Sequence, residues 1–87
     1  MQPHVKIYFE SLGYVKGDWI NCEVHNCRSS AVDIHHIIPR SKFGKKCKDE
    51  QDKITNLIAL CRDCHNKAHD NELSKEYLQS ITEKRWV

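Results

Sequence analysis

The sequence has no long hydrophobic run, and none of its stretches approaches the roughly 18 apolar residues that suggest a membrane-spanning helix. Its N-terminus also lacks the apolar run of a secretory signal peptide. We therefore expect no membrane contact, no secretion and an intracellular, cytoplasmic location. The sequence has little net charge as well, since 14 cations and 12 anions leave only +2. Any patch that binds nucleic acid must therefore be local.

A second shortage is hydrophobic material for a core. The 87 residues make one small domain, of which 39% are hydrophobic and 30% charged. A core of this size supplies little net stability, so a metal or disulfide staple is expected. Four of the five cysteines fall into two close pairs. This arrangement favours zinc over a disulfide framework and indicates a reducing compartment.

The segment Leu60–His69, LCRDCHNKAH, contains two kinds of metal ligand. Cys61 and Cys64 form a CxxC pair, which places two thiolates on one short loop, as half of a tetrahedral zinc site requires. His65 and His69 are four residues apart, so on a helix both imidazoles face one side and can share an ion. The segment therefore predicts halves of two different metal sites.

Cys22 and Cys27 supply the missing half of the cysteine site, because four intervening residues lie within the usual range for a zinc knuckle. We expect a structural zinc, since four protein ligands leave no position open for catalysis. Unliganded thiols, disulfides or a zinc with His25 in place of one thiolate are the alternatives. Cys47 has no nearby partner and is expected to be an exposed free thiol.

Residues 31–38, AVDIHHII, are β-branched and apolar with polar interruptions, and Pro39 ends the run. We predict a strand of about six to eight residues. On a regular pleat His35 and His36 point to opposite faces. Both reach one site only if the strand twists, bulges or ends there. Otherwise one histidine is buried and the other exposed.

Residues 56–61, NLIALC, predict a second short strand that leads into the helix of the CxxCHxxxH segment. With the elements in the order strand, long loop, strand, helix, the HHIIP, NLIALC and CxxCHxxxH segments resemble the HNH endonucleases. The resemblance covers about half of the chain, from Cys22 to His69. It implies an α+β protein with a ββα-metal (His-Me finger), treble-clef-like core, stapled by a structural zinc.

The resemblance also implies a role for each polar residue of these segments. His36 matches the general-base histidine, and His35 matches the metal-ligand position before it. Asn56 matches the asparagine that braces the loop and orients the base. His65 and His69 match ligand positions of the colicin-type nucleases. The two cysteine pairs match the subset of the family whose zinc is structural.

Phosphodiester hydrolysis is compatible with these roles. A histidine is a suitable base at neutral pH, and an ion bound to three imidazoles keeps positions open for substrate oxygens. The second ring nitrogen of the base needs an acceptor, for which we expect a backbone carbonyl in the loop braced by Asn56. Asp33 either orients a ligand on the face of His35 or is a plain exposed strand residue. The ion itself stays open among Mg²⁺, Mn²⁺, Ni²⁺ and Zn²⁺.

The loop after Pro39 has five cations and no acid over nine residues, which suits contacts with a DNA backbone. Asp49, Glu50 and Asp52 follow and dilute this patch, and an ordinary solvated loop is the alternative. Backbone contacts predict no recognition sequence. The expected DNA-binding residues are Arg40, Lys42, Lys45, Lys46 and Lys48.

Two amphipathic helices are predicted around the core of about 20–71, over residues 3–13 and 74–86, all within one domain of residues 1–87. Ser74 is the predicted N-cap of the second helix, and Arg85 near its end should favour the helix dipole. His4 is expected to be an exposed terminal residue, and Trp19 to pack over the first cysteine pair.

We therefore predict a metal-dependent HNH endonuclease that cuts DNA with one divalent ion and leaves 5′-phosphate and 3′-hydroxyl ends. The alternative is a non-catalytic treble-clef zinc module that binds nucleic acid or protein within a larger complex. A homodimer, a phage or restriction complex, a mobile-element role and a toxin with a neutralising partner all stay open.

Overall fold

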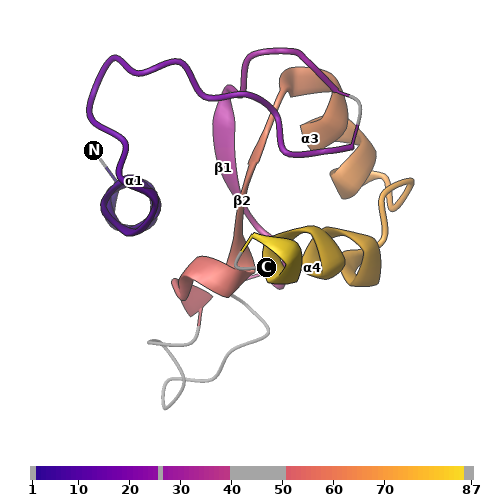
Figure 1. Ribbon diagram of the computed structural model, residues 1–87. Helices are drawn as coiled ribbons and strands as arrows, with labels where there is room; N and C mark the ends of the chain where they lie inside the picture. The colour runs from indigo at the N-terminus through magenta and orange to yellow at the C-terminus, as the bar shows by residue number, and fades with distance from the viewer. Residues whose placement is uncertain (1, 26, 40–50, 86–87) are drawn as a thin grey trace.

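The computed structural model describes residues 2–25, 27–39 and 51–85. The elements along the chain are helix α1 (Pro3–Leu12), strand β1 (Asp33–His36), the short 3-10 helix η3 (Ile54–Asn56), strand β2 (Leu57–Leu60), helix α3 (Arg62–His69) and helix α4 (Lys75–Lys84). The predicted α+β class is confirmed, with a ββα core between two flanking helices (Figure 1). Within the described residues, no helix is long and apolar enough to cross a membrane.

The two strands pair antiparallel, with Asp33 opposite Leu60 at one end. β1 is shorter than the predicted strand because, after His36, the Asn56 side chain hydrogen-bonds the backbone N–H and carbonyl of Ile38 in place of a paired strand. The Asn56 Oδ1 accepts a hydrogen bond from the Ile38 N–H at 2.9 Å, and its Nδ2 donates to the Ile38 carbonyl at 3.2 Å. β1 therefore ends at His36, which is one of the conditions under which both neighbouring histidines can serve one site.

β2 is buried on both of its faces, since all four of its residues are 0% exposed. Successive side chains alternate between the faces. Ile58 and Leu60 belong to the hydrophobic cluster on the side of α3 and α4, while Leu57 and Ala59 belong to the cluster on the side of α1. Figure 1 shows the hairpin between these helices. Burial of one Leu or Ile side chain contributes about 1.5–3 kcal/mol to folding stability. Because β2 buries such side chains on both faces, the helices on both sides stabilise the strand pair.

The helix ends follow the sequence signals. Gly13 ends α1 with φ 78°, in the left-handed region that favours glycine. Ser74 caps α4 as predicted, because its Oγ accepts a hydrogen bond from the Tyr77 N–H at 3.1 Å. α3 begins after Cys61, whose Sγ accepts from the Cys64 N–H at 3.5 Å, so one of the four paired cysteines is also the helix cap.

Two minor expectations are wrong. His4 is only 5% exposed, because α1 lays its first turn against the end of β1 and brings the His4 ring to the ring of His36. Trp19 is 68% exposed and donates its indole N–H to the Asn21 side chain instead of packing over the first cysteine pair.

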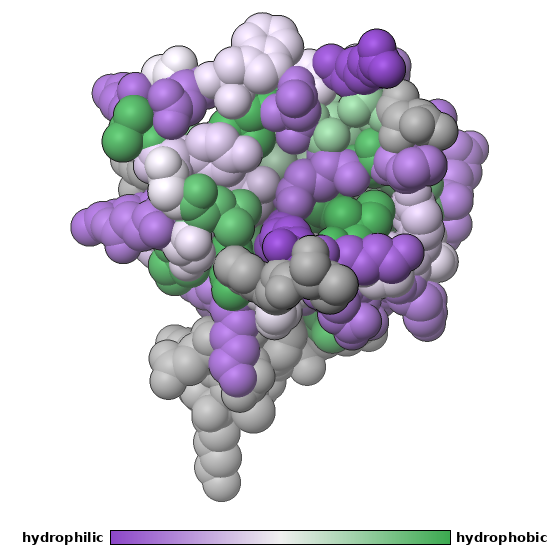
Figure 2. Space-filling model, in the orientation of Figure 1, coloured by the Kyte–Doolittle hydropathy of each residue, from purple (hydrophilic) through white to green (hydrophobic). Residues whose placement is uncertain are grey.

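Hydrophilic residues cover most of the face in Figure 2, with hydrophobic groups showing between them.

A part-buried ion pair connects Glu23, next to the first cysteine of the N-terminal pair, to Arg85 at the end of α4. Arg85 does more than face the dipole of α4: its Nε and Nη2 donate to the two carboxylate oxygens of Glu23, each at 2.7 Å. The Glu23 carboxylate also accepts from the Tyr8 hydroxyl and from the Ala59 N–H. Burial, followed by the charge of Glu23, raises the pKa of Tyr8, so the phenol stays a donor. Nothing in the sequence pattern predicted this pair.

Candidate functional site

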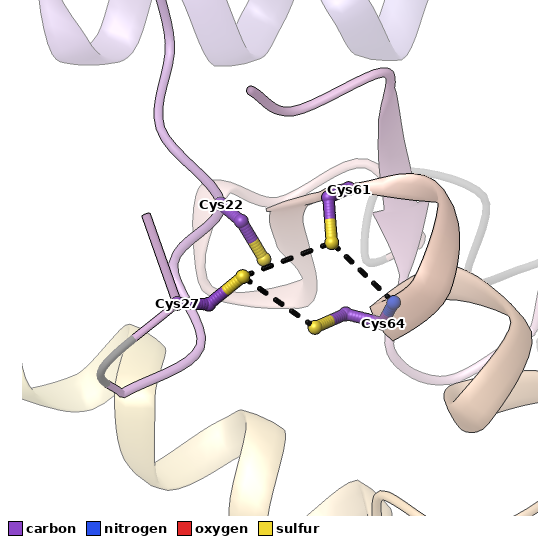
Figure 3. Close-up of side chains that lie close together, drawn as sticks. All are labelled: Cys22, Cys27, Cys61 and Cys64. Atoms are coloured by element: carbon purple, nitrogen blue, oxygen red, sulfur yellow. Dashed lines mark hydrogen bonds between the residues drawn. The ribbon is translucent and has the colours of Figure 1, made fainter. Parts of the chain in front are cut away.

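The four paired cysteines converge on one point between β2 and the start of α3 (Figure 3). The Sγ of Cys27 lies 3.8 Å from the Sγ of Cys61 and 3.9 Å from that of Cys64, and all four sulfurs lie within 4.8 Å of one another. A tetrahedral zinc with bonds of about 2.3 Å separates its sulfurs by about 3.8 Å, whereas a disulfide needs about 2.05 Å. The spacing therefore suits a zinc site and does not suit disulfides.

Two of these thiols stay neutral unless a cation stabilises their thiolates. Burial raises the pKa of Cys22 and of Cys64, because a buried thiolate lacks the hydration that it has in water. A backbone N–H at Ser29 lowers the pKa of Cys27 to about 7. A divalent cation would compensate the buried negative charge. His25 is exposed and lies outside this group, and Cys47 lies outside the described residues.

A second group, which shares no residue with the first, consists of His35, His65 and His69. The two helical imidazoles are 4.6 Å apart between ring centroids, and the His35 ring lies 5.2 Å from His65 and 5.8 Å from His69. One ring nitrogen from each lies within 4.8 Å of the others. The i, i+4 pair on α3 thus faces the histidine on that side of β1, and the three imidazoles can share one ion.

Electrostatics keeps His35 in the form that binds metals. Burial, then the neighbouring His65 and His69, lowers the pKa of His35 to about 4, so the ring is neutral near neutral pH. A neutral imidazole offers the lone pair that a metal ligand needs. Asp33 was expected either to orient a ligand on the face of His35 or to be a plain exposed strand residue; its side chain is 47% exposed, and its Oδ2 lies 3.6 Å from the Nε2 of His65. A carboxylate at this place can orient a ligating histidine.

His36 points to the other face of β1. Its Nε2 lies 2.8 Å from the Oδ1 of Asp52, and its ring centroid is 4.5 Å from that of His4. Neither neighbour was predicted from the sequence. Asp52 follows a loop whose path the sequence does not predict, and His4 is 32 positions away in the chain.

Asn56 is 7% exposed and bonds to two separate segments. Besides the two bonds to Ile38, its Nδ2 donates to the carbonyl of Gln51 at 2.8 Å. The side chain therefore ties the end of β1 to the residue before Asp52. The predicted backbone-carbonyl partner of His36 is replaced by the Asp52 carboxylate.

A cavity of about 630 Å³ brings the two faces of β1 into one site. The cavity runs along β1 and past the end of this strand. His35 and His36 therefore both line the cavity, although their side chains point to opposite faces of the strand. The N-terminal end of α1 contributes its N-cap Gln2 and His4 to the wall, and α4 contributes Lys75. The predicted DNA-binding residues Arg40, Lys42, Lys45, Lys46 and Lys48 lie outside the described residues.

Comparison with known proteins gives a match to a family model described as HNH endonuclease over residues 19–71, more than half of the chain. The chain is 35% identical over 54 residues to the mitochondrial DNA mismatch repair protein mutS homolog of Sarcophyton glaucum, covering 62% of this chain and 5% of that protein. It is 32% identical over 50 residues to the type IV methyl-directed restriction enzyme EcoKMcrA of Escherichia coli (strain K12), covering 58% and 16%.

A third relative has a name unrelated to DNA: ion transport peptide of Schistocerca gregaria, 36% identical over 52 residues, covering 58% of this chain and 40% of that protein. The chain thus spans between 5% and 40% of the length of these relatives. No solved structure gives a significant match.

Proposed function

The chain belongs to the HNH endonuclease family, and on this premise we propose that it hydrolyses DNA phosphodiester bonds with one divalent ion and a histidine base. The observation that carries the proposal is the convergence of His35, His65 and His69 beside His36 in one cavity. A module with only a structural zinc needs the four cysteines and has no use for a second set of ligands.

His35, His65 and His69 would hold the catalytic ion. When bound, this ion supplies a Lewis acid for a phosphate oxygen and for the leaving 3′-oxygen. Three imidazoles favour Ni²⁺ or Zn²⁺ over Mg²⁺ and Mn²⁺, which prefer oxygen ligands. Cys22, Cys27, Cys61 and Cys64 would hold a separate structural zinc that ties the N-terminal knuckle to α3.

His36 would act as the general base, accepting a proton from the attacking water. The side chain of Asn56 would brace the strand end that carries this base, through Ile38. Cleavage with the 3′-oxygen as the leaving group gives 5′-phosphate and 3′-hydroxyl ends. Two of the relatives are named for DNA mismatch repair and DNA restriction, which supports DNA as the substrate. The cations of residues 40–48 would contact its backbone.

The test uses zinc-loaded protein and supercoiled plasmid, with Mg²⁺, Mn²⁺, Ni²⁺ or Zn²⁺ added in turn. Wild type should convert the plasmid with at least one ion, and the new ends should be substrates for ligation. His36→Ala should be inactive, while His25→Ala, a histidine that is exposed and outside both ligand groups, should cut like wild type. Folded wild type that binds DNA but cuts with none of the ions would support the non-catalytic zinc module instead.

A further inference from the structure

We infer that Asp52 and His4 are positioning residues that hold the His36 ring, so that its Nδ1 is the basic nitrogen. The inference rests on the proposed function, because it assigns the proton acceptor of that same base. Neither residue was assigned a role by the family resemblance, and His4 lies outside the matched residues 19–71.

The contact with Asp52 determines which ring nitrogen is available. The Asp52 Oδ1 lies 2.8 Å from the His36 Nε2, and the two side chains are 20% and 13% exposed. A carboxylate accepts hydrogen bonds and donates none. In the neutral ring the proton must therefore be on Nε2, which leaves the lone pair on Nδ1. A buried aspartate sets the tautomer of the histidine base in serine proteases by the same principle, although there the carboxylate holds Nδ1 and Nε2 is the basic nitrogen.

The contact with His4 restricts the plane of the ring. His4 is 5% exposed, and its ring meets that of His36 at 4.5 Å between centroids with an angle of 48° between planes. Because the Asp52 bond holds one edge of the His36 ring, a neighbour against its face limits rotation about that bond. α1 therefore contributes to the geometry of the site as well as to the core.

The pair is also held from behind by Asn56. Its side chain bonds Ile38, two residues after His36, and Gln51, the residue before Asp52. One amide thus fixes the backbone on both sides of the His36–Asp52 contact. Contacts within the fold therefore set the geometry of the pair.

The first experiment is Asp52→Asn, measured as kcat and KM for plasmid cleavage. The new amide can donate a hydrogen bond to Nε2, which favours the tautomer with the proton on Nδ1 and removes the basic nitrogen. We expect kcat to fall by about 10²–10⁴-fold, as for the wrong tautomer or a lost general base, with KM nearly unchanged. Asp18→Asn is the matched control, since that carboxylate also accepts one hydrogen bond but is exposed and remote from His36.

The second readout is the ¹⁵N NMR signature of the His36 imidazole in zinc-loaded protein at slightly alkaline pH. Wild type should show the proton on Nε2, and Asp52→Asn should shift the population toward Nδ1. A wild-type ring protonated on Nδ1, or an unchanged tautomer and kcat in Asp52→Asn, would overturn the role of Asp52. This spectrum is informative even if wild type proves inactive, so failure of the inference and failure of the proposed function are distinguishable.

His4 is tested by a pair of variants. His4→Ala removes the ring contact and should lower kcat by about two- to tenfold, the range expected for one ring–ring contact. His4→Phe keeps a ring against His36 and should restore most of the loss. Equal losses in both variants, or no loss in His4→Ala, would show that the ring does not position His36.

Discussion

Cys64 and His65 are neighbours in the sequence, yet their substitution should have opposite consequences. The Cys64 side chain joins the cysteine group, whereas His65 joins the histidine group on another side of α3. Cys64→Ser should release the structural zinc and unfold the protein. His65→Ala should leave that zinc and the fold intact, and should weaken only the binding of the catalytic ion.

The magnitudes follow from what each side chain contributes. A structural zinc contributes about 10–16 kcal/mol of apparent binding free energy, while a domain of 87 residues has about 4–13 kcal/mol of net stability. Damage to the zinc site can therefore remove the whole stability of the fold. The His65 side chain is 17% exposed and contacts mainly the groups of its own site. Its loss should cost about 1 kcal/mol, the usual size for a point substitution.

The assay combines metal analysis of the purified proteins, circular dichroism during thermal unfolding, and plasmid cleavage. Wild type and His65→Ala should each carry one tightly held zinc and melt cooperatively, but only wild type should cut well. His25→Ala is the control for loss of an imidazole near the cysteine pairs. Release of the structural zinc by His65→Ala, or a folded zinc-free Cys64→Ser, would refute the division into two sites.

Three further outcomes are expected. The rate of end-labelled cleavage should fall by about 10²–10⁴-fold in His36→Ala, with ion binding intact. His35→Ala should instead weaken ion binding, and its cleavage should recover at high metal concentration. Metal rescue of His36→Ala but not of His35→Ala would mean that the two roles are reversed. Arg85→Met should lower the free energy of unfolding by about 1.5–3 kcal/mol in urea, because the part-buried Glu23 carboxylate loses two charge-assisted hydrogen bonds, and an unchanged free energy of unfolding would contradict this. Asn56→Ala should lower the free energy of unfolding by about 2–3 kcal/mol through lost hydrogen bonds. It should also slow cleavage, and an unchanged cleavage rate would exclude the proposed bracing role of Asn56.

The parts of the fold that were predictable depend on short-range patterns. The spacing of Cys61 and Cys64, the i, i+4 histidines and the Ser74 cap each follow from the geometry of one turn or one helix. The apolar run of residues 56–61 predicted a short strand, which β2 is, and β2 is buried on both faces. These features need no knowledge of how distant segments meet.

The features that were missed all require two distant segments to meet. In the sequence Asp52 looks like one of the acids that dilute a basic patch, since only the tertiary fold brings its carboxylate to His36. Arg85 was assigned to the helix dipole, although its partner Glu23 lies 62 positions away. Both are charged residues whose local pattern is that of a solvated surface. Charge alone does not reveal a partner, because an exposed and a buried carboxylate look the same in the sequence.

The adjacent histidines show how local and long-range information combine. The pleat places His35 and His36 on opposite faces of β1, which by itself argues against a shared site. The structure resolves this at the strand end, where the cavity passes from the face covered by α3 to the face covered by α1. His35 therefore meets the two helical imidazoles, while His36 meets Asp52 and His4. The proposed base and the proposed metal ligands therefore lie on opposite faces of β1. This separation allows Asp52 and His4 to hold the His36 ring without this ring competing for the ion.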